Sequence, residues 1–155
     1  MYTLGHERGT AALPRQVKLR TWLDRAVSVA AHRELDGSPV LDNPQAQTAL
    51  CRALVAVEVL PHHAYRTVGE FLIGGAVGPD CSSVKLLMAE AEQQLAATVL
   101  DVLGPTLLRG DRDDVTENDF WYETYLYSRA ASVYGGTRQI QRDIIADRIL
   151  SLPEE

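Results

Sequence analysis

The residues with the clearest chemical potential lie near the end of the chain, at the entry to an amphipathic segment: Tyr134, Gly135, Gly136 and Thr137. The two glycines allow the backbone to approach a ligand closely. Thr137 stands where the amino end of a helix leaves backbone N–H groups without partners, and such groups favour an anion or another acceptor. A plain helix cap explains the same residues, so this pattern alone predicts either a cap or an anion-binding turn.

A longer run around this turn resembles the carboxy-terminal signature of acyl-CoA dehydrogenases. That signature is Tyr-(Glu or Gly)-Gly-Thr-x-(Glu or Gln)-Ile-Gln-Arg followed by Ile-Ala-x-Arg, and here it reads YGGTRQIQR from residue 134 and IADR from residue 145. Three more segments resemble the family: GHERGT, HRELDGSPVLDNPQAQTAL and SSVKLLMAEAEQQLAATVLDVLG. The resemblance implies that residues 1–155 form the carboxy-terminal helical bundle domain alone, without the family's amino-terminal helical and middle β domains.

The resemblance also implies a flavoprotein that uses FAD to remove two hydrogens across the α,β bond of an acyl-CoA thioester. A carboxylate takes the α-proton and the flavin takes the β-hydride. Members with Glu in the second signature position use it as the base, but Gly135 stands there in this sequence. A subgroup of the family places the base at the position matched here by Glu7. Such a base needs an apolar, water-poor pocket; the alternative is that Glu7 merely complements a helix dipole.

By the same resemblance, Thr137 and Gln139 contact FAD, while Tyr134 and the backbone N–H of Gly135 line the thioester end of the substrate. Arg33 reaches the flavin pyrophosphate across a subunit contact, a role that suits the fork of donors on a guanidinium. The implied partners are an acyl-CoA substrate, an electron-acceptor flavoprotein and further copies in a homodimer or homotetramer. A separate chain that supplies the missing domains is a further implied partner.

Three positions depart from the family pattern in the region that holds the ADP half of the flavin: Asp36, Asp101 and Pro105. Negative charge at the first two positions opposes a pyrophosphate. A second hypothesis therefore stays open. It is a non-catalytic bundle derived from this family that serves oligomerisation or partner binding.

The elements that must position these residues are predicted from apolar side chains that recur at spacings of three and four, which indicates helices throughout. Because each helix has one apolar face, we expect an all-α fold: an antiparallel four-helix bundle with a short additional carboxy-terminal helix. The expected core stripe of the first helix is Leu19, Trp22, Leu23, Ala26 and Ala30. That of the second, capped by Asn43 and Pro44 and kinked at Pro61, is Leu50, Leu54, Val57, Tyr65, Val68 and Leu72.

The remaining boundaries follow from caps and helix breakers. Ser82 or Ser83 is expected to cap a third helix that stops at Gly104 and Pro105, with a core stripe of Val84, Leu87, Met88, Ala91, Leu95, Val99 and Val102. A polar loop over 108–119 then leads to a fourth helix over about 120–134. The last helix is expected to start at about Arg138 and to place four isoleucines on a common side: Ile140, Ile144, Ile145 and Ile149.

Composition narrows the class of protein. The chain has 155 residues, 46% of them hydrophobic and 23% charged, which is typical of one globular domain. A net charge of −6 argues against nucleic-acid binding. No apolar run approaches a membrane span and no signal peptide is recognisable, so we expect a cytoplasmic protein. Cys51 and Cys81 lack metal-ligand spacing and are expected to be small buried side chains, so no metal site is predicted.

Overall fold

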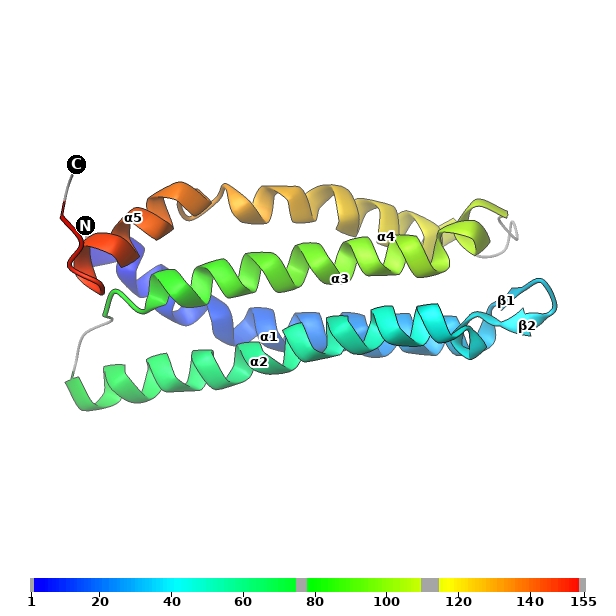
Figure 1. Cartoon of the computed structure of the whole chain (residues 1–155), viewed down its shortest axis with the longest axis horizontal. Coiled ribbons are helices and arrows are strands. Elements are labelled where there is room, and N and C mark those ends of the chain that lie inside the picture. The colour runs from blue at the N-terminus through cyan, green and yellow to red at the C-terminus, as the bar shows by residue number, and fades with distance from the viewer. Residues whose placement is uncertain (1, 75–77, 110–114, 154–155) are drawn as a thin grey trace.

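The computed structural model describes residues 2–74, 78–109 and 115–153, and within these ranges the side chains of residues 11–74, 78–104 and 117–153. Four helices alternate in direction and pack side by side (Figure 1): α1 Tyr2–His32, α2 Pro44–Gly74, α3 Cys81–Arg109 and α4 Val115–Ser128. A 3-10 turn, η3 Arg129–Ser132, then leads to the short helix α5 Arg138–Arg148. The predicted all-α, antiparallel four-helix bundle with an additional carboxy-terminal helix is confirmed. Among the described residues, no helix is both long and apolar enough to cross a membrane.

A small hairpin joins α1 to α2 at the end of the bundle opposite to α5 (Figure 1). Its strands are β1 Glu34–Leu35 and β2 Ser38–Pro39, and a 3-10 turn, η1 Val40–Asp42, follows them. Asp36 and Gly37 form the turn with φ angles of 55° and 84°. An Asp-Gly pair is well suited to a two-residue hairpin because both central residues need positive φ. The sequence prediction recognised only a helix break here and missed the hairpin.

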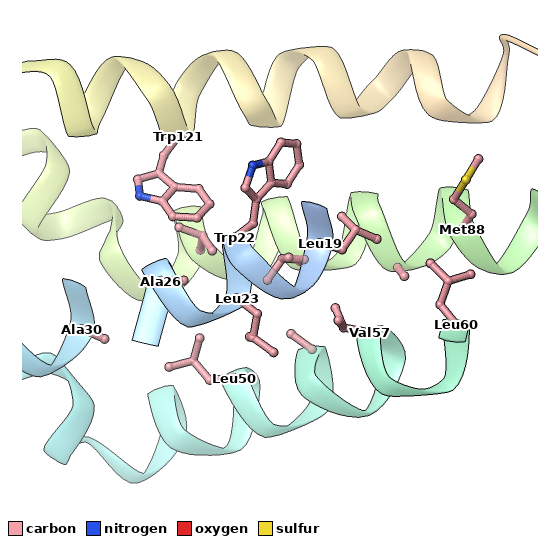
Figure 2. Packing of buried hydrophobic residues seen from close by; sticks show 14 of the residues in the cluster. Leu19, Trp22, Leu23, Ala26, Ala30, Leu50, Val57, Leu60, Met88 and Trp121 are labelled. Carbon is pink, nitrogen blue, oxygen red and sulfur yellow. The ribbon is translucent and has the colours of Figure 1, made fainter. Parts of the chain in front are cut away.

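The hydrophobic core lies along the axis between the helices (Figure 2). All five predicted core residues of α1 are buried, and those of α3 are buried or packed against the core. α4 contributes Trp121, which is 1% exposed, the largest fully buried side chain in the described part of the chain. The core therefore links all four long helices into one unit.

The predicted core stripe of α2 is wrong in half of its members. Leu54, Tyr65 and Leu72 are exposed, whereas the residues that face the core follow a strict alternation of four and three: Ala46, Leu50, Ala53, Val57, Leu60, Ala64 and Thr67. This seam is rich in alanine, and small side chains let neighbouring helices approach closely. The larger apolar residues of α2 lie on a second face of the helix, which is exposed. The helix continues through Pro61 without a break.

Several predicted boundaries are also wrong. α3 begins before the two serines, because the backbone N–H of Val84 donates to the backbone carbonyl of Asp80 at 3.2 Å. Ser82 is buried and does not cap the helix. α3 runs to Arg109 instead of stopping at Gly104, and α4 starts at Val115, which shortens the expected loop. The side chain of Pro105 lies outside the described residues. α4 ends at Ser128 because the chain tightens into η3 before the glycine turn.

Two side-chain predictions need correction as well. In α5 the buried residue is Gln141, which contacts the carbonyl groups of the preceding turn. Ile140 and the C-cap residue Ile149 are 49% and 38% exposed. Cys81 is buried as expected, but Cys51 is exposed because it follows Leu50 on the outer side of α2.

Candidate functional site

The chain passes from η3 to α5 through a tight turn, residues 133–137, here named the signature turn. Gly135 and Gly136 have φ angles of 68° and 102°, which residues other than glycine rarely adopt. The hydroxyl oxygen of Thr137 accepts a hydrogen bond from the backbone N–H of Ile140 at 3.4 Å, so the helix cap suggested by the sequence is present. A hydroxyl that accepts such a bond still has a proton to donate to a ligand.

Gln141 stabilises the signature turn through hydrogen bonds. Its side chain is 1% exposed, and its Nε2 donates to the carbonyl oxygens of Gly135 and Gly136 at 3.0 and 3.5 Å. Buried carbonyl groups need such partners. The α5 sequence therefore fixes the shape of the turn that precedes it.

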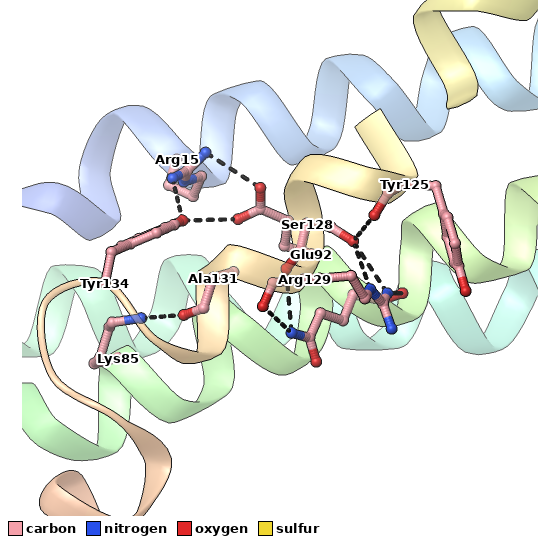
Figure 3. Close-up of polar contacts among 9 residues, drawn as sticks. Arg15, Lys85, Glu92, Tyr125, Ser128, Arg129, Ala131 and Tyr134 are labelled. Atoms are coloured by element: carbon pink, nitrogen blue, oxygen red, sulfur yellow. Dashed lines mark hydrogen bonds and ion pairs between the residues drawn. The ribbon is translucent and has the colours of Figure 1, made fainter. Parts of the chain in front are cut away.

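Tyr134, the first signature residue, joins two helices through its hydroxyl group (Figure 3). The guanidinium of Arg15 on α1 donates to the Tyr134 oxygen, and the Tyr134 hydroxyl donates to Oε2 of Glu92 on α3 at 3.4 Å. Arg15 and Glu92 also form an ion pair at 3.3 Å, in which the Glu92 side chain is fully buried and that of Arg15 is 18% exposed. Three elements distant in sequence thus meet at one hydroxyl.

Lys85 of α3 also contacts Tyr134 and the 3-10 turn that precedes it. Its buried ammonium group donates to the backbone carbonyl of Ala131 in η3 and lies 4.6 Å from the centre of the Tyr134 ring (Figure 3). A cation over an aromatic face is attracted by the partial negative charge of that face. The Lys85 stem also passes Gly135, where an added Cβ would lie 3.3 Å from its Cε.

The pKa of Tyr134 is raised to about 12, first by burial and then by the adjacent charge of Glu92, whose effect exceeds the opposing effect of Arg15. A phenol with this pKa stays protonated in the physiological range. Tyr134 can therefore act as a hydrogen-bond donor and as an aromatic surface, but not as a base at neutral pH.

The raised pKa of Tyr134 predicts a loss of stability at alkaline pH. Because the folded state binds this proton more tightly than the unfolded state, the contribution is complete below the ordinary pKa of 10.0 and is lost as pH rises toward about 12. We expect the free energy of unfolding to fall with pH in this range, and to fall less steeply in Tyr134→Phe. Urea unfolding at several pH values measures both slopes, and equal slopes would contradict the assignment.

Gly135→Ala tests the requirement for glycine in the signature turn. A non-glycine residue at this φ costs about 1–2 kcal/mol, and the added methyl group would press on Lys85. We expect urea unfolding to show a loss of this size. Gly69→Ala in α2 is the control, since a Cβ there meets nothing within 4 Å and should raise stability by up to about 1 kcal/mol. A Gly135→Ala protein as stable as the parent would show that the turn can relax.

The structure brings together some of the residues predicted for the site and separates others. Tyr134, Gly135 and Thr137 share the signature turn, and Gln139 is exposed in the first turn of α5. Glu7 lies within α1, despite Pro14 further along, but its side chain lies outside the described residues. The amino-terminal part of α1 and α5 occupy the same end of the bundle (Figure 1).

Arg33 stands between the end of α1 and the start of β1, and this hairpin lies at the end of the bundle opposite to α5 (Figure 1). Its guanidinium donates to Oδ1 of Asn118 on α4 at 3.0 Å. One chain therefore cannot bring Arg33 and the signature turn to the same part of one small ligand. The role of Arg33 across a subunit contact stays a prediction.

Beside the hairpin, an open groove of about 500 Å³ lies between β2, η1, α2 and α3. Its lining includes three acidic residues, Asp36, Asp42 and Asp101. The two acidic departures from the family pattern thus face the same space. Negative charge from three acidic residues around one groove is unfavourable for a bound diphosphate.

Sequence reasoning missed three residues that shape the site: Arg15, Glu92 and Gln141. Glu92 carried a signal, because it lies between Met88 and Leu95 on the face of α3 that points to the core, and an acid at such a position needs a partner. Arg15 carried none, since an arginine on a long helix is usually solvated.

Comparison with known proteins agrees with this architecture. The family model for the carboxy-terminal domain of acyl-CoA dehydrogenases matches residues 1–150. The acyl-CoA dehydrogenase IpdE1 of Mycobacterium tuberculosis (strain ATCC 25618 / H37Rv) is 35% identical over 159 residues, an alignment that covers 100% of this chain and 38% of the relative.

Two solved structures share the fold. PigA with FAD and proline has a TM-score of 0.80 and 19% identity, covering 96% of this chain and 37% of that one. The ChsE4-ChsE5 complex from Mycobacterium tuberculosis has a TM-score of 0.75 and 21% identity, covering 90% of this chain and 37% of that one. The bundle, the closing helix and the signature turn thus define an all-α domain of a kind found within larger proteins. The chain belongs to the acyl-CoA dehydrogenase family, as its carboxy-terminal domain.

Proposed function

We propose that this domain serves the FAD-dependent α,β-dehydrogenation of an acyl-CoA thioester. The observation that carries the proposal is the signature turn: its glycines, its capping threonine and its buried supports are all in place, at the same end of the bundle as the Glu7 segment of α1. FAD, when bound, accepts the β-hydride. The chain spans 38% of the length of the M. tuberculosis relative, so other segments or another chain complete the pocket.

Each residue has a defined part in this proposal. Glu7 takes the α-proton, since Gly135 offers no side chain for that task. The backbone N–H of Gly135 and the protonated Tyr134 line the thioester end of the substrate. Thr137 and Gln139 contact the flavin from the amino end of α5, where helix N–H groups favour acceptors.

The distance between Arg33 and the signature turn supports assembly with a second bundle. Arg33 would then reach the flavin pyrophosphate of a neighbouring subunit. The outer face of α2 offers an apolar surface for such contacts, including Tyr65, Leu72 and Ile73, which are 62%, 75% and 93% exposed. We propose a homodimer or homotetramer, or pairing with a different chain, as in the two-protein composition that the ChsE4-ChsE5 structure names. An electron-acceptor flavoprotein would reoxidise the cofactor.

The acidic groove favours a second candidate at the hairpin end. Because Asp36, Asp42 and Asp101 disfavour a pyrophosphate there, a non-catalytic bundle that serves oligomerisation or partner binding is the alternative function.

Flavin content distinguishes the two candidates. The protein that carries this domain is purified together with the segments or chain that supply the rest of the family's length, and is incubated with FAD. We expect a yellow protein that reduces an artificial electron acceptor when given acyl-CoA thioesters of increasing size. A colourless protein that forms a defined oligomer would favour the non-catalytic alternative.

A further inference from the structure

The polar cluster around Tyr134 contains a buried ion pair that the proposed function does not use. Glu92 is 0% exposed, and its carboxylate faces Arg15 from α1 and the Tyr134 hydroxyl from the signature turn. Desolvation offsets most of the attraction within a buried ion pair, so stability alone is a poor reason for such a pair. Its distinctive effect is on orientation, because Arg15, Glu92 and the Tyr134 hydroxyl each restrict the other two groups.

The hydrogen bonds form a closed triangle (Figure 3). Nη1 of Arg15 contacts Oε1 of Glu92 at 3.3 Å, while Nη2 of Arg15 donates to the Tyr134 hydroxyl. The same hydroxyl donates to Oε2 of Glu92 at 3.4 Å. The guanidinium uses two nitrogens and the carboxylate uses both oxygens, so the planes of both groups are fixed.

The triangle ties the signature turn to a particular place on α1. Arg15 follows Glu7 by eight residues, which places the backbones of the two residues about 12 Å apart along the axis of α1. Lys85 and Gln141 hold the same turn from α3 and α5. Among these described contacts, the Arg15 guanidinium connects the turn directly to the helix that carries the proposed base, and Glu92 holds that guanidinium from α3.

We propose that Glu92 is a positioning residue: through Arg15 and the Tyr134 hydroxyl, it sets the signature turn relative to the Glu7 segment of α1. The inference about the turn rests on the contacts alone, and its effect on catalysis rests on the proposed function. Misplacement of a reacting group by about 1 Å costs roughly 100-fold in rate. Loss of this link should therefore lower turnover more than it weakens substrate binding.

Glu92→Gln tests this proposal, because it removes the charge with little change in shape. Glu117→Gln is the matched control: Glu117 is the partner of Arg25 in another ion pair of α1, has a side chain only 14% exposed, and lies on α4 away from the turn. Tyr134→Phe removes the hydroxyl and keeps the ring, so it tests the same link if Glu92→Gln fails to fold. All variants are made in the assembled protein.

Hydrogen–deuterium exchange of the backbone amides in residues 133–137 gives a readout that needs no activity. We expect exchange there to be about tenfold faster in Glu92→Gln and in Tyr134→Phe, and unchanged in Glu117→Gln. Exchange of these amides at the parental rate in Glu92→Gln and Tyr134→Phe would overturn the proposal. Equal acceleration of exchange in Glu117→Gln would also overturn it.

Kinetics test the catalytic consequence. In Glu92→Gln we expect kcat to fall roughly 10- to 100-fold while KM changes less than about threefold, and the double variant with Tyr134→Phe to fall no further than the larger single effect. If Glu92→Gln exchanges faster in the turn but keeps the parental kcat, the proposed effect of Glu92 on catalysis is overturned. If the parent itself shows no acyl-CoA oxidation, the proposed function fails, whereas the exchange result still decides whether Glu92 positions the turn.

Discussion

Glu7→Gln is expected to lower the turnover of the assembled enzyme by about 10²- to 10⁴-fold, the contribution of a general base to proton transfer. Glutamine keeps the size of the side chain but cannot accept the α-proton at neutral pH. Gly135 has no side chain that could replace it, and the nearby Tyr134 stays protonated because its pKa is about 12. FAD content should be unchanged, since the proposed flavin contacts belong to other residues. Steady-state kinetics with an acyl-CoA thioester and the visible flavin spectrum measure the two quantities.

Asp24→Asn is the control for this experiment. Asp24 also lies on α1, but its side chain is 61% exposed and forms an i,i+4 ion pair with Arg20 on the surface. Such pairs contribute little, so both turnover and stability should stay near those of the parent. Parental turnover in Glu7→Gln would remove the base from this position and direct the search to another carboxylate of the assembled pocket.

Trp121→Ala is expected to cost about 3–5 kcal/mol of unfolding free energy, the largest stability effect in the domain. The indole is 1% exposed and its ring centre lies 4.9 Å from that of Phe120. Its Nε1–H donates to Oε1 of Glu117 at 2.7 Å, so the substitution removes both a large apolar surface and a partly buried hydrogen bond. Urea unfolding followed by circular dichroism measures the loss.

Tyr127→Ala provides the comparison on the same helix, because Tyr127 is 60% exposed. A change within about 0.5 kcal/mol is expected there. A loss below about 1 kcal/mol in Trp121→Ala would mean that α4 is not an integral part of the core. The path from α4 through η3 to the signature turn would then be less firmly held than the contacts indicate.

The sequence was most informative where periodicity and local chemistry agreed. The stripe on α1 from Leu19 to Ala30 gave the core face of that helix correctly, and Thr137 before Arg138 gave the start of α5. Both signals are local: one is set by helical repeat and the other by a single capping side chain.

The errors arose where tertiary contacts decided the outcome. In α2, large residues such as Leu54 and Tyr65 suggested the core, but alanines at the seam allow closer packing, and periodicity cannot tell which of two apolar faces is covered. The hairpin at Asp36 and Gly37 was missed because its strands have only two residues each, too short for an alternating pattern.

For the site, the signature supplied Tyr134, Gly135 and Thr137, and the structure places all three in one turn. It could not supply Arg15 and Glu92, which lie 77 residues apart and meet only because α1 and α3 pack side by side. The position of Glu92 on the core face of α3 indicates that it needs a partner, but the local sequence does not identify Arg15 as that partner.

Anaerobic titration of the assembled, FAD-loaded protein with acyl-CoA thioesters tests the proposed dehydrogenase activity most directly. The account predicts that the visible flavin absorption band bleaches as substrate is added, and that an equivalent amount of the α,β-unsaturated acyl-CoA appears. An FAD-loaded protein whose flavin band stays unchanged across short, long and ring-bearing thioesters, with no unsaturated product, would contradict it.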